Sequence, residues 1–147
     1  MSVIKYEVHV DSDGNKYWYL NGKLHREDGP ACEYPSGTKE WYLNGKLHRE
    51  NGPAVVNSDE GKYWCINGKY HRVDGPACEY ADGRKEWWVN GQRHREDGPA
   101  IEYPNRRKSW YINGEKLTEQ EFNNRHIKEM TISEIQALLG HKIKVIE

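Results

Sequence analysis

The chain has 147 residues and a formal net charge of −1, from 22 basic and 23 acidic side chains. Such a balance creates no global field that would attract nucleic acid or an anionic membrane, so neither is expected as a partner. Only 35% of the residues are apolar, and ten Tyr and six Trp stand against one Phe and two Met, which excludes a thick aliphatic core and favours a thin sheet.

The first ten residues, MSVIKYEVHV, are expected to form a capping strand at the start of the fold. They lack the basic and apolar regions of a signal peptide, and no apolar run in the chain reaches membrane-spanning length. We therefore expect a cytoplasmic protein that makes no membrane contact.

Residues 11–117 contain five copies of a 23-residue unit. Each copy has a Trp followed by an Asn-Gly pair, and the first four continue with a His-Arg pair and then Gly-Pro-Ala. The step of 23 is kept without a slip at Trp18, Trp41, Trp64, Trp87 and Trp110, at Asn21, Asn44, Asn67, Asn90 and Asn113, and at His25, His48, His71 and His94. A tandem array of this kind buries apolar side chains between neighbouring units, without a central core.

Three turn signals divide each unit into strands. Asn-Gly after an aromatic run accepts the positive φ angles of a tight hairpin turn. Asp-Gly-Pro is expected to form a second turn, in which Gly takes a left-handed conformation, Pro opens the next strand and the following Ala packs tightly. A third turn, such as Pro35-Ser36-Gly37 or Ala81-Asp82-Gly83, leads to the next Trp.

The number of strands per unit is left open by these signals, because Lys-Leu-His-Arg could be a short third strand or part of a long loop. An odd number of meandering strands would reverse the chain direction from unit to unit, so two strands are the simpler solution. We favour a Trp strand, a loop through His-Arg, and a return strand at Ala-x-Glu-Tyr. The predicted fold is mainly β, an elongated single-layer antiparallel β-hairpin repeat with a small α/β C-terminal cap.

Residues 118–147 form the predicted cap, since the fifth unit loses its second half. Thr118 and Glu121 have the spacing of a capping box, which predicts a short helix through Phe122 to about Lys128. A second helix is expected over 134–139, ended by Gly140 and followed by a final strand in 141–147. The cap would cover the edge of the last repeat; a role in dimerisation or as a docking helix is the alternative.

Side chains alternate across each Trp strand, so the strand has two different faces. One face carries Trp and an aliphatic residue in every unit and is expected to be the packing face. The other varies, and Cys65 interrupts its aromatic row. Aromatic residues dominate protein interfaces, so this row predicts partner contact through Tyr19, Tyr42, Trp88 and Tyr111. The alternative is that these residues cover a sheet that has to shield both faces.

The His-Arg pairs are the other candidate binding residues. Equivalent His residues would be spaced by about 10 Å along the array, so a metal site is not expected. We expect the His rings to pack on Trp and the Arg residues to pair with Glu33, Glu79 or Glu102. The alternative is a ladder that grips phosphates or a carboxylate-rich protein surface, formed by Arg26, Arg49, Arg72 and Arg95.

The three cysteines, Cys32, Cys65 and Cys78, are odd in number and lack the paired spacing of metal ligands. Cys32 and Cys78 are two units apart, which would place them about 19 Å from each other, too far for a disulfide. We expect all three to be small buried strand residues.

The 23-residue period, the W-Y-x-N-G-K strand and the His before a Gly turn resemble a variant of the MORN repeat over residues 11–117. This resemblance implies a twisted single-layer hairpin sheet with a binding or scaffolding role. Where the MORN unit has His-Gly-x-Gly, this chain has His-Arg-x-Asp-Gly-Pro, so the lipid-binding roles proposed for that family do not carry over. The chain more closely resembles the H-R-x-D-G-P-A repeat proteins of large tailed phages and other large DNA viruses, which often end as residues 113–122 do here. This second resemblance implies a phage accessory protein.

No nucleophile elbow, phosphate loop or metalloprotease motif occurs in the sequence. Each candidate residue recurs four or five times, whereas an active site is a single asymmetric constellation. We therefore expect no enzyme and no cofactor, but a phage-encoded binding protein that inhibits a host protein, such as part of a defence complex, in the host cytoplasm. The alternatives are a sponge that holds a small anionic nucleotide between Arg and aromatic side chains of paired chains, and a structural or virion assembly protein. A homodimer through the C-terminal segment or a sheet edge is a further expectation.

Overall fold

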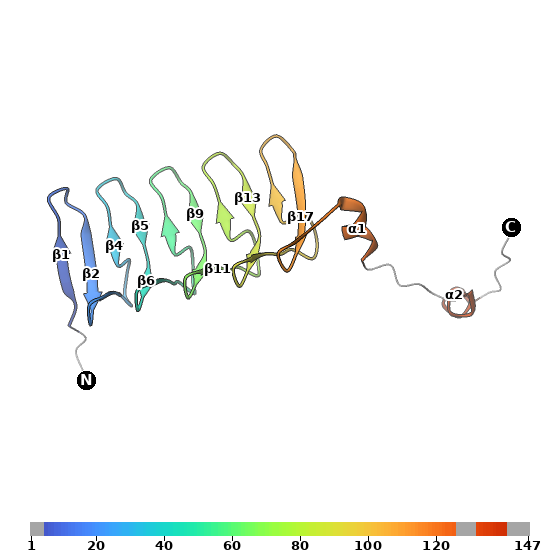
Figure 1. Cartoon of the computed structure of the whole chain (residues 1–147), viewed down its shortest axis with the longest axis horizontal. Coiled ribbons are helices and arrows are strands. Elements are labelled where there is room, and N and C mark those ends of the chain that lie inside the picture. The colour runs from blue at the N-terminus through green and yellow to red at the C-terminus, as the bar shows by residue number, and fades with distance from the viewer. Residues whose placement is uncertain (1–4, 126–131, 141–147) are drawn as a thin grey trace.

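The computed structural model describes residues 5–125 and 132–140. It is a mainly β structure, in which short antiparallel hairpins follow one another along the chain (Figure 1). Within these residues, two short helices come after the last strand. The prediction of an elongated array of antiparallel β-hairpins is confirmed.

A main sheet runs through all the repeats, and its strands lie in chain order with each antiparallel to the next. This order follows from the short turns, because antiparallel neighbours need only a few residues to connect them. The strands are β1 (Glu7–Val10), β2 (Lys16–Leu20), β4 (Cys32–Glu33), β5 (Lys39–Glu40), β8 (Val55–Val56), β9 (Lys62–Tyr63), β12 (Cys78–Glu79), β13 (Lys85–Glu86), β16 (Ile101–Glu102), β17 (Lys108–Ile112) and β18 (Glu115–Leu117).

Each unit also contains a second, smaller hairpin, so the preferred arrangement of two strands per unit is wrong. The Lys-Leu segment before His-Arg, or its equivalent, is a short strand that pairs across the Asn-Gly turn with the second half of the Trp strand. These strands are β3 (Lys23–Leu24), which pairs with β2, and the pairs β6 (Tyr42–Leu43) with β7 (Lys46–Leu47), β10 (Cys65–Ile66) with β11 (Lys69–Tyr70), and β14 (Trp88–Val89) with β15 (Gln92–Arg93).

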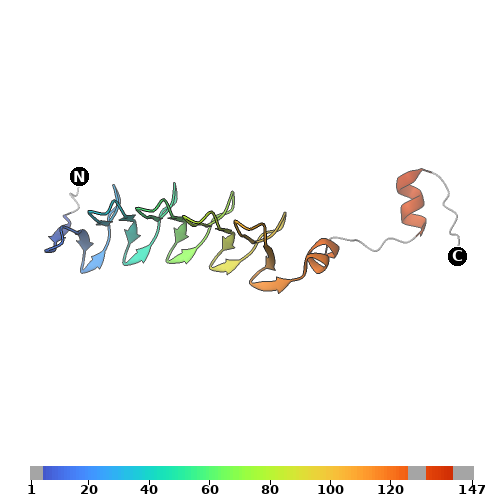
Figure 2. The same cartoon turned by 90° about the horizontal axis from the view of Figure 1, so that it is seen from above.

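The extra strand does not reverse the units, because it does not extend the main sheet. The loop from His-Arg to Gly-Pro carries the chain back, so the main sheet still gains two strands per unit and identical units repeat as a regular zigzag (Figure 2). Backbone hydrogen bonds also join successive small hairpins: Gly45 N donates to Leu24 O at 2.8 Å, and Arg26 N donates to Tyr42 O at 3.1 Å.

The Asn-Gly turns have the backbone that the sequence predicts. Their Asn residues have φ between 51° and 53°, and the Gly residues that follow have φ between 72° and 83°. Two successive positive φ angles define the hairpin turn whose twist matches that of the flanking strands. The Asn-Gly pair therefore sets where each Trp strand turns back.

The buried residues are small, as a thin sheet requires. Ala31, Ala54, Ala77 and Ala100 are fully buried, and each carbonyl accepts the backbone N–H of the Trp in its own unit at 2.8 Å. This confirms the tight-packing role predicted for the Ala of Gly-Pro-Ala.

The three cysteines are free and buried, as predicted. Burial raises the pKa of the thiols, to about 11 for Cys32 and Cys65 and to about 12 for Cys78. They are therefore uncharged side chains of the sheet interior at neutral pH.

The helix α1 (Glu119–Asn124) closes the C-terminal end of the array. Thr118 Oγ1 accepts the backbone N–H of Glu121, and the Glu121 carboxylate accepts that of Thr118, so the predicted capping box is present. The helix packs on β17 and β18 and buries Phe122. It ends at Asn124, before the expected Lys128, which lies outside the described residues.

The second helix, α2, covers Ile132–Leu139, two residues earlier at its start than predicted. The final strand expected in 141–147 lies outside the described residues. Neither helix is long and apolar enough to cross a membrane, within the part of the chain that the structure describes.

Candidate binding surfaces

The guanidinium of each His-Arg pair lies over the indole ring of its own unit. The guanidinium carbon is 4.2 Å from the ring centroid for Arg26 on Trp18, and between 3.9 and 4.0 Å in the next three units. This corrects the expectation that His would pack on Trp. A planar, delocalised cation suits the negative face of an indole better than an imidazole does.

The same guanidinium groups are hydrogen-bonded within the protein. Arg72 donates to the Pro76 carbonyl at 3.2 Å, to Glu79 at 3.3 Å and to Asp74 at 2.9 Å. Arg26 and Arg95 make the equivalent bonds, which confirms the predicted pairs with Glu33, Glu79 and Glu102. The Arg side chains are only about a fifth exposed, so they serve first to hold the Gly-Pro loop over the Trp strand.

The Gly of Asp-Gly-Pro gives the guanidinium its room. A Cβ on Gly29 or Gly75 would lie 2.9 Å from the guanidinium carbon of the preceding Arg, closer than real Cβ contacts occur. Among the four equivalent residues a left-handed φ occurs at Gly52 alone, at 153°. The left-handed turn predicted for this Gly is therefore wrong in the other three units, where close packing of the Arg explains the residue.

Each His joins one unit to the next. His48 Nδ1 accepts the backbone N–H of Asn67 at 3.2 Å and contacts the Asn67 side-chain oxygen at 3.1 Å. The other three units repeat the backbone bond, at 3.1 to 3.2 Å. The His side chains thus fix the position of each following Asn-Gly turn.

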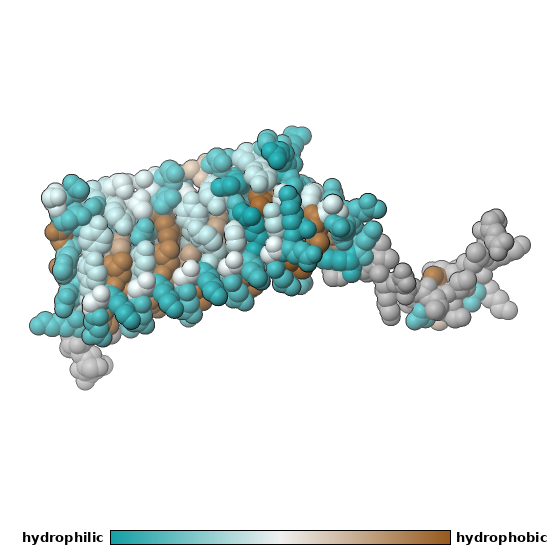
Figure 3. Space-filling model, viewed as in Figure 1, coloured by the Kyte–Doolittle hydropathy of each residue, from teal (hydrophilic) through white to brown (hydrophobic). Residues whose placement is uncertain are grey.

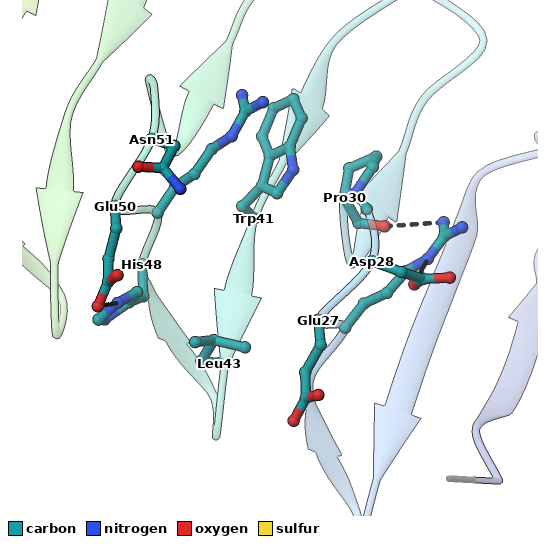
Figure 4. Close-up of a pocket in the computed structure, with 11 residues that line it drawn as sticks. Glu27, Asp28, Pro30, Trp41, Leu43, His48, Glu50 and Asn51 are labelled. Carbon is teal, nitrogen blue, oxygen red and sulfur yellow. Dashed lines mark hydrogen bonds and ion pairs between the residues drawn. The ribbon is translucent and has the colours of Figure 1, made fainter. Parts of the chain in front are cut away.

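Three similar clefts open between successive Gly-Pro loops, with volumes of about 590, 630 and 800 Å³. In the first, Trp41 and Leu43 lie between the loop that carries Glu27 and Asp28 and the loop that carries His48 (Figure 4). The sequence led us to expect that the Trp and aliphatic face would be the packing face. The clefts show that this face is not fully packed, because it is open between the loops.

The opposite face of the main sheet varies from unit to unit, as expected, but it also contains most of the buried strand residues and is therefore a packing face. Directly paired residues share a face of a sheet. The register places in one row Tyr17, Cys32, Glu40, Val55, Tyr63, Cys78, Glu86, Ile101 and Ser109. Cys32, Cys78, Glu86 and Ile101 of this row are at most 3% exposed.

The predicted aromatic row, Tyr19, Tyr42, Trp88 and Tyr111, is half-buried along the small hairpins. Cys65, which occupies the same position in the third unit, is 2% exposed and interrupts it. Burial, together with the nearby Glu40 carboxylate, raises the pKa of Tyr42 to about 12. In the space-filling view, apolar strips alternate with polar ones along the array (Figure 3).

A cluster around Glu86 distinguishes the fourth unit from the others. The Glu86 carboxylate is 2% exposed and accepts a hydrogen bond from Trp88 Nε1 at 3.0 Å. Arg93 lies 3.3 Å from the same oxygen, and Arg84 lies 3.4 Å from the other. A buried carboxylate needs such partners, because its charge is costly to remove from water.

Arg93 is a candidate binding residue that the sequence analysis missed. Its guanidinium carbon lies 4.8 Å from the centroid of Trp88 and 5.4 Å from that of Tyr111, so it connects two rings of the predicted row. The available signal was its departure from the first three units, where the equivalent residues are Leu24, Leu47 and Tyr70.

Within residues 5–125 and 132–140, no three His, Cys, Asp or Glu residues are grouped so that they could hold a metal ion. Comparisons of the sequence with protein-family models and with curated proteins give no match.

Proposed function

We propose that this protein is a non-catalytic binding protein, an accessory protein of the phage H-R-x-D-G-P-A type that binds and inhibits a host macromolecule. The MORN-like character and the phage context rest on the sequence motifs given above. The array of antiparallel hairpins is compatible with both. A host protein in the cytoplasm of the infected cell, such as a component of a defence complex, is the proposed target.

The observation that carries the proposal is the grouping of Trp88, Arg93 and Tyr111 on one side of the small hairpins. Trp, Tyr and Arg are the residue types that most often dominate binding energies in protein interfaces. The Glu86 carboxylate holds Trp88 and Arg93 in place before any partner binds. Such preorganisation reduces the entropy lost on binding.

The other predicted residues divide into two groups. Tyr19 and Tyr42 extend the proposed surface toward the N-terminal units. Arg26, Arg49, Arg72 and Arg95 stack on the Trp residues of their own units, which supports a structural role for them in place of direct partner contact.

The test is affinity capture from a host lysate with the wild-type chain and with Tyr111→Ala and Arg93→Ala variants. We expect one host protein at stoichiometric yield with the wild type, and at least a tenfold loss of capture with either variant, equivalent to about 1.4 kcal/mol. Val73→Ala is the matched control, because Val73 is 83% exposed but lies in the loop that lines the clefts. Equal capture by all the proteins would contradict the proposed surface.

A second candidate function, sequestration of a small anionic nucleotide, is favoured by the two arginines that pair with Glu86. Arg84 and Arg93 are each about a third exposed, and Arg84 Nε is a buried donor without a hydrogen-bond partner. Aromatic rings beside them could stack on a base. Protein purified from infected cells would then release a nucleotide on heating. Detection of the chain in purified virions would instead favour the structural alternative.

A further inference from the structure

The N-terminal strand β1 is an uncovered edge of the main sheet. It pairs with β2 on one side, and no other strand among the described residues pairs with it. All four of its residues are exposed, and Val8 and Val10 are 52% and 60% exposed. The opposite end of the sheet is different, because α1 packs on β17 and β18 there.

The direction of the free backbone groups of β1 follows from the turn that leads to β2. Asp11 N donates to Asn15 O across this turn, so Asp11 belongs to the residues whose backbone groups point toward β2. Backbone groups alternate in an antiparallel ladder, so those of Glu7 and His9 also point toward β2. Val8 and Val10 therefore point their N–H and C=O groups outward, on the side where no described strand pairs with β1.

Tyr6, which directly precedes β1, contacts the first repeat unit. The backbone N–H of Glu27 donates to the Tyr6 hydroxyl at 3.2 Å, and the Tyr6 ring centroid lies 6.5 Å from that of His25. Tyr6 is thus held beside the N-terminal end of β1.

We propose that β1 pairs with β1 of a second copy of this chain, antiparallel and about a twofold axis at Val8. Val8 then lies opposite Val8 of the second copy, and Tyr6 lies opposite Val10, so the outward-pointing residues hydrogen-bond to one another. Glu7 lies opposite His9, and Lys5 opposite Asp11. Every pair joins two apolar residues or an acidic residue with a basic or titratable one, which stabilises a cross-strand pair.

The neighbouring registers lack this complementarity. In such a dimer the outward-pointing residues of one copy must face those of the other. The register can therefore shift only in steps of two residues, which keep Val8 opposite another outward-pointing residue. One such shift, Val8 opposite Tyr6, places Glu7 opposite Glu7. The other, Val8 opposite Val10, places His9 opposite His9 and Glu7 opposite Asp11. Both bring like charges together, and the edge therefore selects one register and its own sequence as partner.

The dimer is expected to be reversible. A pairing over seven residues per chain buries less than the roughly 1,200 Å² at which stable interfaces begin, so its population should rise with protein concentration. The proposal concerns the edge of the sheet and does not depend on the proposed host target, which would bind the small hairpins of the later units.

The test is sedimentation equilibrium of the full chain over a concentration series. We expect a monomer–dimer equilibrium for the wild type and at least a tenfold weaker association for Val8→Lys, which brings two positive charges together on the twofold axis. Val73→Lys, at a valine that is 83% exposed and lies outside β1, is the control and should associate as the wild type does. A wild type that stays monomeric, or a Val8→Lys variant that dimerises normally, would overturn the proposal.

A charge exchange tests the register. Glu7→Lys and His9→Glu should each weaken association, because each leaves like or unpaired charges opposite position 9 or 7. The double variant restores opposite charges in this register and should recover the dimer. Recovery supports the register, and a double variant weaker than both single variants would refute it. Both positions are exposed, so circular dichroism should show an unchanged fold in every variant.

Discussion

The guanidinium of each repeat Arg lies close to both an indole ring and a glycine. This arrangement explains why Asp-Gly-Pro keeps its Gly in units where the backbone angle does not require one. It also links three separate motif positions, Trp, Arg and Gly, into one packed layer over the strand.

Replacing Gly75 by Ala should destabilise the protein by displacing Arg72 from Trp64. We expect Arg72→Ala to cost about 2 kcal/mol in free energy of unfolding, because it removes the cation–π contact and several hydrogen bonds. Gly75→Ala should cost about 1 kcal/mol or more in the wild type but close to nothing in the Arg72→Ala background, since the clash is then gone. Urea unfolding followed by Trp fluorescence measures this cycle.

The equivalent pair in the second unit provides a matched control. Gly52 has a φ of 153°, so Ala is strained there whether or not Arg49 is present. Gly52→Ala should therefore remain destabilising in the Arg49→Ala background. Additive effects at Gly75 and Arg72, within about 0.5 kcal/mol, would contradict the packing argument.

Among the secondary-structure elements, the short ones depend most on their ends. The small hairpins have only two paired residues per strand, so their position depends on the Asn-Gly turn and on the His bond to the next unit. The helix α1 has six residues, which is too short to be stable in isolation. Its stability must come from its cap and from the burial of Phe122.

Thr118→Ala should loosen α1, because it leaves the backbone N–H of Glu121 without its acceptor. We expect a loss of about 1 kcal/mol in the stability of this end of the array. Hydrogen exchange of the amides in residues 119–124 should become faster, while exchange in the first three repeats stays the same. Thr118→Ser keeps the hydroxyl and should behave as the wild type; equally slow exchange in Thr118→Ala would show that the cap is not needed.

For the molecule as a whole, the important property is that each unit contacts mainly its neighbours. The main sheet adds its strands in chain order, and the bonds between small hairpins also join adjacent units. The stability of such an array is approximately a sum over units and the contacts between them. Removing a whole unit should therefore shorten the protein without unfolding it.

Deletion of residues 39–61, one full period, joins Thr38 to Lys62 and brings Tyr63 opposite Cys32 in place of Glu40. We expect a folded protein whose urea m-value falls by about one fifth, because less surface is exposed on unfolding. Deletion of residues 39–50 removes half a period and breaks the register, so it should not fold cooperatively. A folded half-period variant would contradict the independent-unit description.

Local signals in the sequence were sufficient for the period, the hairpin turns, the buried Ala and Cys positions and the capping box at Thr118. These features depend on backbone geometry or on spacing within a few residues. In a repeat protein the same local signal recurs in each unit, which makes it easier to recognise. The contacts of the Arg and His side chains were harder to predict from the sequence. Arg-Glu pairing was predicted correctly, but the placing of Arg on Trp depends on how the Gly-Pro loop folds over the strand.

The third strand of each unit and the burial of Glu86 required the folded structure, because both depend on contacts between segments rather than on any one of them. The Lys-Leu segment is a strand since the Trp strand continues beyond the main sheet and offers it an edge. The buried Glu86 carboxylate is paired with Arg84, which directly precedes β13, and with Arg93 of β15. The amino-acid pattern thus established a repeating hairpin, and the packing of one hairpin against the next established which of its residues remain exposed.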